Sequence, residues 1–489
     1  MKTRIEGAAA GADVTVHTVP AYGFAAALAE VSPVTRVETD ISREELARIR
    51  LRLPEAHWEA PATDPQTPPP ASASPLLEAM TAPAVAHVIV ERDGREIGRA
   101  PVMILPPRDW SHAEDSRVLV AAHVAAGDDD VFRLTLDAGG GEALWAVARE
   151  GAEDAALRVL RCLYDHVAAS AAVYQEPERS TDDRTRASWQ TVRAPHDVLD
   201  AAHRSAKGTC LDLTLVLAGA LECLGLPPLV VFTGSPDRAP RHACLGLWAD
   251  GGRRFHPVVT DVEQLRKRVA SGELIVVETT GLCGGSRALG FDEARDAAGR
   301  LVRETPDVHA VDVLAARPPH GDVRPVRLAH DPTVRAAFWA GESLRRRLHA
   351  RSRETLHLLY GLCATRGSLT HRLFERCGVE EDAILRILDS SLPNEGHEGP
   401  SSETQSYRVA LETARLNARG RGAAAVEEGD VLWAVLDSPS RNVRRVVEAS
   451  GSDCTVLLAA LAREWRRSRD ATISRHFDAV PPGSPRSGG

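Results

Sequence analysis

Residues 207–232 read KGTCLDLTLVLAGALECLGLPPLVVF, and this stretch decides the fold of the central region. Leucine and alanine recur there at three- and four-residue spacing, which is typical of a helix. Thr209 can cap the first turn of this helix, while Gly225 and the two prolines shortly after it end the helix. We therefore expect a helix that begins at Cys210 and a buried strand that follows it.

Cys210 is a candidate nucleophile because of its place at the start of this helix. A thiol there lies in the positive field of the helix dipole, which favours the thiolate. Residues 241–248, RHACLGLW, predict the next strand, and His242 at its mouth could accept the thiol proton. The alternative is that Cys210 is a small buried apolar residue, as most intracellular cysteines are and as we expect for Cys223.

Glu278 ends another apolar strand. Residues 272–280 read GELIVVETT, and their run of four aliphatic side chains indicates a central strand with both faces buried. An acid at the end of such a strand can orient a histidine and stabilise its imidazolium, as the third residue of a catalytic triad does. The alternative is that Glu278 is a solvated carboxylate at the strand end, and this stretch taken alone favours that alternative.

These segments resemble the transglutaminase-like cysteine peptidase superfamily. The likeness is to a bacterial branch with the pattern GTCLDL, LExxGxxP and GHA. It is carried by the GTCLDL and LECLGLPP segments, by His242 at the head of a strand and by Glu278 with a threonine two residues later. Residues 189–195, WQTVRAP, are similar to the GQxVRxP segment of that branch, and the likeness spans residues 157–301. The resemblance implies a papain/transglutaminase-like α+β core with Cys210 as nucleophile, His242 as general base and Glu278 as orienting acid.

Gln190 is a further candidate, twenty residues before Cys210. Its side-chain amide could donate a hydrogen bond to an oxyanion that forms at Cys210. The alternative is an ordinary surface glutamine, which the sequence favours.

The composition argues against several classes of function. With 4% aromatic residues and a formal net charge of -9, the chain lacks the stacking platforms and basic surface that bind nucleic acids. Its eight cysteines form no CxxC pair, so neither a disulfide framework nor a metal site is predicted. No glycine-rich loop is followed by Lys and Ser or Thr, so we expect no bound nucleotide, and no other cofactor is predicted.

The sequence predicts a cytoplasmic protein. No apolar segment follows the basic residues at the N-terminus, so a secretory signal is not expected. The most apolar window, residues 211–232, is interrupted by Asp212, Glu222 and two prolines, so no membrane span or membrane partner is predicted. A reducing cytosol would keep a working thiol reduced.

The predicted fold class is multidomain α+β. Alternating apolar residues broken by prolines indicate an N-terminal β-rich module, and a hairpin with an Asp-Gly turn is expected at residues 85–105. The predicted order is a β-sandwich-like module at 1–60, a Pro-rich linker at 61–75, a hairpin-containing α/β region at 76–150, the transglutaminase-like domain at 151–305, a linker at 306–330, an all-α duplicated helical repeat at 331–466 and a disordered tail at 467–489.

The C-terminal region contains an internal repeat with a constant shift of 73 residues. This shift places ERCG at 375–378 on EASG at 448–451, and LYGL at 359–362 on LWAV at 432–435. The duplication resembles the Clp N-terminal (Clp R) domain, which serves AAA+ unfoldases as a platform for peptides and adaptors. The resemblance implies a polypeptide substrate or protein partner, with an AAA+ protein as one candidate partner.

Two hypotheses of function follow. The first is a cysteine peptidase or amidase that uses a Cys-His-Glu triad and recruits polypeptides through the C-terminal repeats. The second is a non-catalytic scaffold or adaptor with an inactive transglutaminase-like domain. The geometry of three side chains distinguishes the two hypotheses. Only the hydrolase requires Cys210 to lie within hydrogen-bonding distance of His242, and His242 within that distance of Glu278, beside an open cleft.

Overall fold

The computed structural model describes residues 2–464, with longer gaps at 67–76, 139–154, 201–204, 250–255, 318–322 and 391–401 and several gaps of one to three residues. The chain forms two compact units, Met1–Arg327 and Leu328–Gly489, and each is described by itself. The predicted disordered tail at 467–489 and most of the predicted linker at 61–75 lie outside the described residues.

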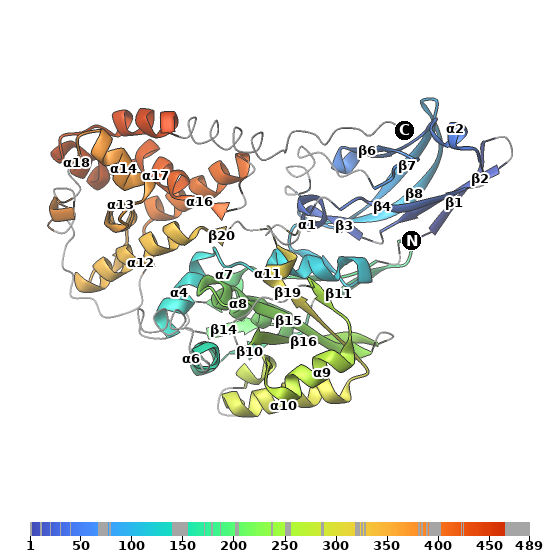
Figure 1. The fold of residues 1–489 in the computed structure, drawn as a ribbon, viewed down its shortest axis with the longest axis horizontal. Coiled ribbons are helices and arrows are strands. Elements are labelled where there is room, and N and C mark those ends of the chain that lie inside the picture. The colour runs from blue at the N-terminus through green and yellow to red at the C-terminus, as the bar shows by residue number, and fades with distance from the viewer. Residues whose placement is uncertain are drawn as a thin grey trace, which may run out of the picture. The chain divides into compact units, whose positions relative to one another are not determined.

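The N-terminal region is β-rich, as predicted, and contains two sheets (Figure 1). An antiparallel sheet has the order β1-β2-β4, and a five-stranded sheet has the order β3-β8-β7-β5-β6. A Cβ atom added to Gly98 would lie 2.5 Å from Cδ1 of Ile5, so the two sheets pack closely. The strands are β1 Lys2–Ala9, β2 Ala12–Thr18, β3 Ala21–Gly23, β4 Val34–Thr39, β5 Ile49–Leu53, β6 Trp58–Pro61, β7 Ala84–Arg92 and β8 Arg95–Leu105, with short helices α1 Phe24–Leu28, α2 Arg43–Leu46 and η1 Pro54–Ala56.

Strand pairing crosses the domain boundary that the sequence predicts after residue 60. The hairpin β7–β8 turns at Asp93 and Gly94, both with positive φ, as the Asp-Gly sequence predicts. β7 then pairs antiparallel with β5, and β8 pairs parallel with β3. The apolar faces of these strands are buried together, so the hairpin of the predicted 76–150 region belongs to the N-terminal sheet.

The centre of the first unit is an antiparallel sheet of order β17-β19-β15-β16-β18. Helix α8, Cys210–Cys223, packs on β15 and β16, while α9 and α10 contact β18. Alternate residues of the strands are buried in two separate clusters, one shared with α8 and one with α10. The elements are β15 Pro228–Ser235, β16 Arg238–Trp248, β17 Val258–Val259, β18 Leu274–Glu278, β19 Asp307–Asp312, α9 Val262–Ser271, α10 Phe291–Glu304 and α11 Val313–Ala316.

Smaller elements surround this core. Sheet order β11-β12-β9 and sheet order β10-β14-β13 lie upstream of α8 in the sequence. The bounds are β9 Asp109–Ser111, η3 Glu114–His123, α4 Asp129–Ala138, α6 Ala155–Ala169, β10 Val173–Tyr174, β11 Arg179–Asp182, β12 Ala187–Thr191, α7 Pro195–Val198, β13 Leu199–Asp200, β14 Ser205–Gly208 and η4 Thr280–Leu282.

The predicted linker at 306–330 contains an inner strand. Residues 307–312 form β19, which pairs with β15 on one side and β17 on the other. His309 in this strand is buried, and its ring stacks on Phe232 with 5.1 Å between the ring centres. The strand is short and carries polar residues that only the tertiary structure buries, so its sequence resembles that of a loop.

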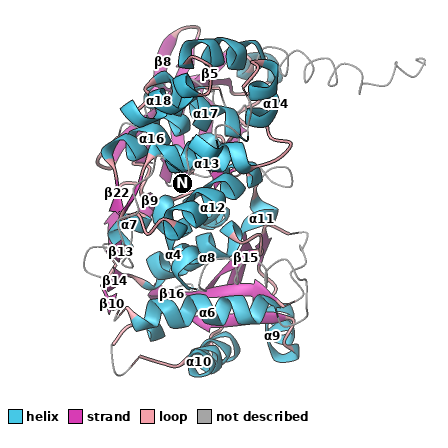
Figure 2. Ribbon diagram, turned by 90° about the vertical axis from the view of Figure 1, so that its left-hand side faces the viewer, coloured by secondary structure: helices cyan, strands magenta, loops and turns pink. Residues whose placement is uncertain are grey.

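The described residues of the C-terminal unit are mainly helical and form a repeat, as predicted (Figure 2). A shift of 73 residues superposes the bounds of α12 on those of α16 and the bounds of α13 on those of α17. Helices α14 and α18 correspond to within one residue, and residues 454–464 are also helical. The bounds are α12 Pro332–Arg347, α13 Thr355–Ala364, α14 Leu369–Arg376, α16 Gln405–Gly420, α17 Glu428–Asp437 and α18 Arg441–Ala449.

The two repeats exchange strands and caps. β20, Ala329–His330, pairs with β23, Ala425–Val426, and β21, Ser352–Arg353, pairs with β22, Ser402–Glu403. The buried carboxylate of Glu428 accepts hydrogen bonds of 2.7 Å from the backbone N–H groups of Leu369 and Thr370, which start α14 of the other repeat. Thr355, which occupies the corresponding position in the first repeat, donates to Ser440 at the start of α18. These exchanges tie the repeats into one unit.

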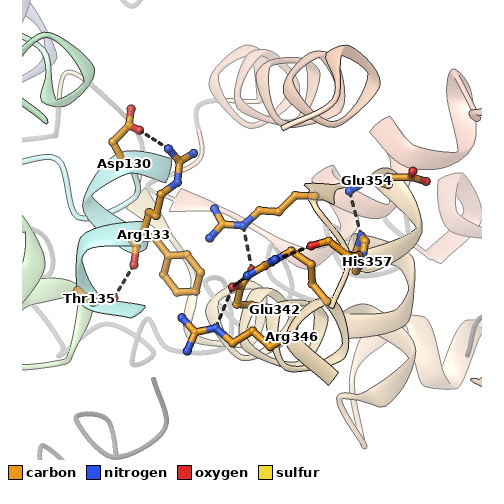
Figure 3. Close-up of polar contacts among 11 residues, drawn as sticks. Asp130, Arg133, Thr135, Glu342, Arg346, Glu354 and His357 are labelled. Atoms are coloured by element: carbon orange, nitrogen blue, oxygen red, sulfur yellow. Dashed lines mark hydrogen bonds and ion pairs between the residues drawn. The ribbon is translucent and has the colours of Figure 1, made fainter. Parts of the chain in front are cut away.

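A buried charge cluster stabilises the first repeat (Figure 3). The Glu342 carboxylate accepts hydrogen bonds of 2.9–3.0 Å from Arg345, Arg346 and Arg353. Burial alone would raise the pKa of Glu342, but the charges of Arg353 and Arg345 outweigh it and lower the pKa to about 2. Since Arg345 and Arg353 are also buried, loss of this carboxylate would remove an anion that binds two buried cations.

We predict that Glu342→Gln lowers the free energy of unfolding of the C-terminal unit by about 3 kcal/mol at pH 7. The carboxylate stabilises the fold above its unfolded pKa of about 4.3, and this contribution is lost as the pH falls towards its folded pKa of about 2. Urea titration of the wild type should therefore show this loss between pH 4 and pH 2, whereas the variant should lack it.

Arg346→Gln is the matched control, because the Arg346 side chain is partly exposed and contacts the same carboxylate. We expect it to cost less than about 1 kcal/mol. Equal losses for the two variants would contradict the role assigned to the buried cations.

Candidate active site

A capping box fixes the start of α8, where Cys210 is the first helical residue. The Thr209 hydroxyl accepts a 3.1 Å hydrogen bond from the Asp212 N–H, and Asp212 accepts a 3.0 Å hydrogen bond from the Thr209 N–H. Arg193 donates to the same carboxylate from its backbone N–H at 2.9 Å and from its guanidinium at 2.8 Å. The helix therefore begins where the sequence predicts, with Cys210 on a rigid turn.

His242 and Glu278 form a direct pair. His242 Nε2–H donates to Glu278 Oε1 over 2.7 Å, from β16 to the end of β18. The carboxylate also accepts from the Thr280 N–H at 2.8 Å, the Thr280 hydroxyl at 2.5 Å and the Gly281 N–H at 2.6 Å. Burial alone would raise the pKa of Glu278, but the hydrogen bonds from His242 and Thr280 outweigh it and lower the pKa. Glu278 is therefore a buried anion and not a solvated strand-end carboxylate.

The surrounding side chains control the charge of the His242 imidazole. Burial alone would lower the pKa of His242, whereas interactions with the side chains of Cys210, Cys244 and Glu278 raise it above its ordinary value. Cys244 lies two residues along the same strand and is fully buried, and burial raises the pKa of its thiol. Because Nε2 is bound to Glu278, Nδ1 is the ring nitrogen left for proton exchange.

Two threonines link the cysteine to the strand ends. The Thr279 hydroxyl donates to the Cys210 carbonyl over 3.1 Å and lies 3.0 Å from the Thr214 hydroxyl. Thr279 directly follows Glu278, so this contact joins the first turn of α8 to the residue that orients His242. All three of the residues predicted from the sequence are thus held in one region, although they come from three different elements.

Gln190 lies beside the cap of α8. It is in β12, is only 3% exposed and donates from Nε2 to the Thr209 hydroxyl over 3.2 Å. The alternative of a surface glutamine is therefore wrong. β12 is held in register by β9, with Gln190 opposite Trp110, and this pairing directs the amide towards the residue before Cys210.

An open pocket with a cavity volume of about 630 Å³ adjoins His242. Sequence reasoning missed most of its wall, although the acid-x-Thr sequence and the glycines after it mark one side. Cys210 is 5% exposed and is not part of this wall, so His242 is the one of the three predicted residues that lines the pocket. The pocket is lined by Ala172, Val173, Tyr174, His242, Thr280, Cys283 and Gly284.

Within the part of the chain that the structure describes, no group of three or more His, Cys, Asp and Glu side chains could hold a metal ion. None of the described helices is long and apolar enough to cross a bilayer.

Comparison with known proteins identifies part of the chain. Residues 332–468 match the family model of the Clp repeat (R) N-terminal domain, which confirms the resemblance predicted for residues 331–466. Among solved structures, the chain is similar to the Hsp104 N-terminal domain from Candida albicans, with 13% identity, a TM-score of 0.25 and coverage of 27% of this chain and 88% of that chain. It is also similar to the N-terminal domain of the caseinolytic protease associated chaperone ClpD from Arabidopsis thaliana, with 17% identity, a TM-score of 0.25 and coverage of 28% and 94%. A search of curated proteins gave no match.

We predict that Glu278→Gln lowers the pKa of His242 by about one to three pH units, because the neutral amide no longer stabilises the imidazolium. Titration of the His242 ring followed by NMR measures this change. In the wild type the ring should remain protonated above pH 6.5, since its pKa is raised. An unchanged titration in the variant would show that the 2.7 Å contact does not control the charge of His242.

Proposed function

We propose that this protein is a cysteine hydrolase, a peptidase or amidase, in which Cys210, His242 and Glu278 act as nucleophile, general base and orienting acid. The observation that carries the proposal is the 2.7 Å hydrogen bond between His242 Nε2 and the buried Glu278 carboxylate, beside a cysteine at a helix N-terminus. A triad needs this order of contacts, because the acid fixes the tautomer and orientation of the base.

In the acylation step, His242 holds and then releases the proton of Cys210. With the Cys210 proton held at His242 Nδ1 as an imidazolium, the Cys210 thiolate attacks the carbonyl carbon of the substrate, forming a C–S bond and an oxyanion. The N–H groups of the first turn of α8 and the Nε2 group of Gln190 are the donors available to that oxyanion. Collapse of the intermediate breaks the C–N bond, and His242 returns the proton to the leaving amine.

Deacylation repeats these roles with water. His242 Nδ1 takes a proton from water as the oxygen attacks the thioester carbonyl, and the collapse breaks the C–S bond and gives the carboxylic acid. The proton stays at His242 Nδ1, which restores the imidazolium beside the Cys210 thiolate. Glu278 stays ionised throughout, since its hydrogen bonds to Thr280 and Gly281 do not depend on the charge of His242.

The Clp repeat domain suggests how substrates arrive. We propose that it binds a polypeptide or a protein partner, with an AAA+ protein as the candidate that this family favours. The duplicated and mutually capped helices form a self-contained unit suited to such docking. All eight cysteines are free thiols, in keeping with a cytoplasmic site of action, which forms part of the proposal.

One observation favours the second candidate function, a non-catalytic scaffold. Cys210 belongs to the apolar cluster of the first unit and is 5% exposed, as a structural cysteine would be. In that case the protein would act through the Clp repeat domain, which would bind the protein partner. The reactivity of the thiol distinguishes the two functions.

We predict that iodoacetamide alkylates Cys210 at pH 6.5 at least about tenfold faster in the wild type than in His242→Ala, because the imidazolium stabilises the attacking thiolate. Peptide mass spectrometry after timed quenching isolates Cys210 from the other cysteines. His256→Ala is the matched control, since His256 is exposed and lies outside the pocket. Equal rates in all three proteins would support the scaffold and contradict the hydrolase.

A further inference from the structure

Strand β10, Val173–Tyr174, connects the two sides of the candidate site. It pairs parallel with β14, which runs directly into Thr209 and Cys210. The Gln175 N–H continues this pairing by donating to the Gly208 carbonyl over 2.9 Å. On the other side, Ala172 forms a bridge with Cys283, and the Gly284 N–H donates to the Ala172 carbonyl. β10 therefore lies between the segment that carries the nucleophile and the loop after Glu278.

The side chains of β10 are apolar and exposed at the mouth of the pocket. Val173 is 56% exposed and Tyr174 is 38% exposed, and both line the pocket that contains His242. Five large hydrophobic side chains are exposed among the described residues, and these two are the only neighbouring pair in that set. Exposed apolar side chains gathered at a concave site are typical of ligand binding.

The pocket wall offers no fixed charge other than His242. Its remaining lining residues are aliphatic, aromatic, hydroxyl, thiol or glycine. Burial and the nearby Glu278 carboxylate raise the pKa of the Cys283 thiol to about 11, so this wall residue is neutral near pH 7. A charged substrate side chain would lose water here without gaining a partner, whereas an apolar one would bury surface.

We propose that Val173 and Tyr174 determine specificity by binding an apolar side chain of the polypeptide substrate, next to the bond that Cys210 attacks. The proposal rests on the function proposed above and names its substrate class. β10 places these side chains beside His242 because its partner strand β14 also delivers Cys210.

Two electrophiles test this proposal on the full-length chain. Iodoacetamide reports the thiol alone, and N-benzyliodoacetamide adds an apolar group to the same reactive centre. We expect wild-type Cys210 to react about tenfold faster with the benzyl reagent than with iodoacetamide, as burial of part of a phenyl ring allows. In Val173→Glu and in Tyr174→Ser this ratio should fall to about one, whatever the iodoacetamide rate itself, because the ratio cancels changes in the reactivity of the thiol.

Val409→Glu is the matched control, because Val409 is a valine of similar exposure, 51%, in the other compact unit. Its ratio should equal that of the wild type. Circular dichroism and thermal unfolding confirm that each variant is folded before its rates are compared.

The outcomes separate the two proposals. If iodoacetamide alkylation depends on His242 but the ratio is the same in wild type, Val173→Glu and Tyr174→Ser, the specificity role is overturned and the hydrolase stands. If alkylation by iodoacetamide is independent of His242, the hydrolase fails by itself, whatever the ratio. A Cys210 that reacts with neither reagent overturns both.

Discussion

The buried Glu278 carboxylate and its contact with His242 are the interaction on which the candidate site depends. A buried carboxylate is costly unless several donors bind it, and here one ring N–H, two backbone N–H groups and one hydroxyl do so. These donors come from β16 and from the loop directly after β18. The site therefore exists only when the central sheet is in register, because a slip of one residue would turn Glu278 to the opposite face.

The same physical arrangement recurs in other parts of the described chain. Asp212 closes the first turn of α8 and binds Arg193, Glu428 caps a helix of the opposite repeat, and Glu342 binds three arginines. In each case a buried anion accepts several hydrogen bonds, from a helix start, from a distant segment or, for Glu342, from arginines 3 to 11 residues along the chain. Removal of such an anion is destabilising, because its donors lose a buried charge partner.

The two compact units differ in how much of their structure local sequence patterns specify. The C-terminal unit is built twice from one pattern, so its helix bounds follow the 73-residue shift that the sequence repeat predicts. The first unit relies on strands that pair across long separations, such as β5 with β7 and β15 with β19. Local pattern is weaker there, because the partner strand decides whether a polar residue such as His309 becomes buried.

The sequence by itself determined the elements whose signals are local. Thr209 and Gly225 bound the α8 helix, the four aliphatic residues before Glu278 specify a buried strand, and Asp93-Gly94 specifies a hairpin, since capping, alternation and turn geometry act within a few residues. Only the tertiary structure decided that Gln190 is buried against Thr209, that β19 is an inner strand, and that Val173 lies beside His242. Those outcomes depend on which distant segments pair, and pairing is governed by the burial of whole faces, which no short stretch of sequence contains.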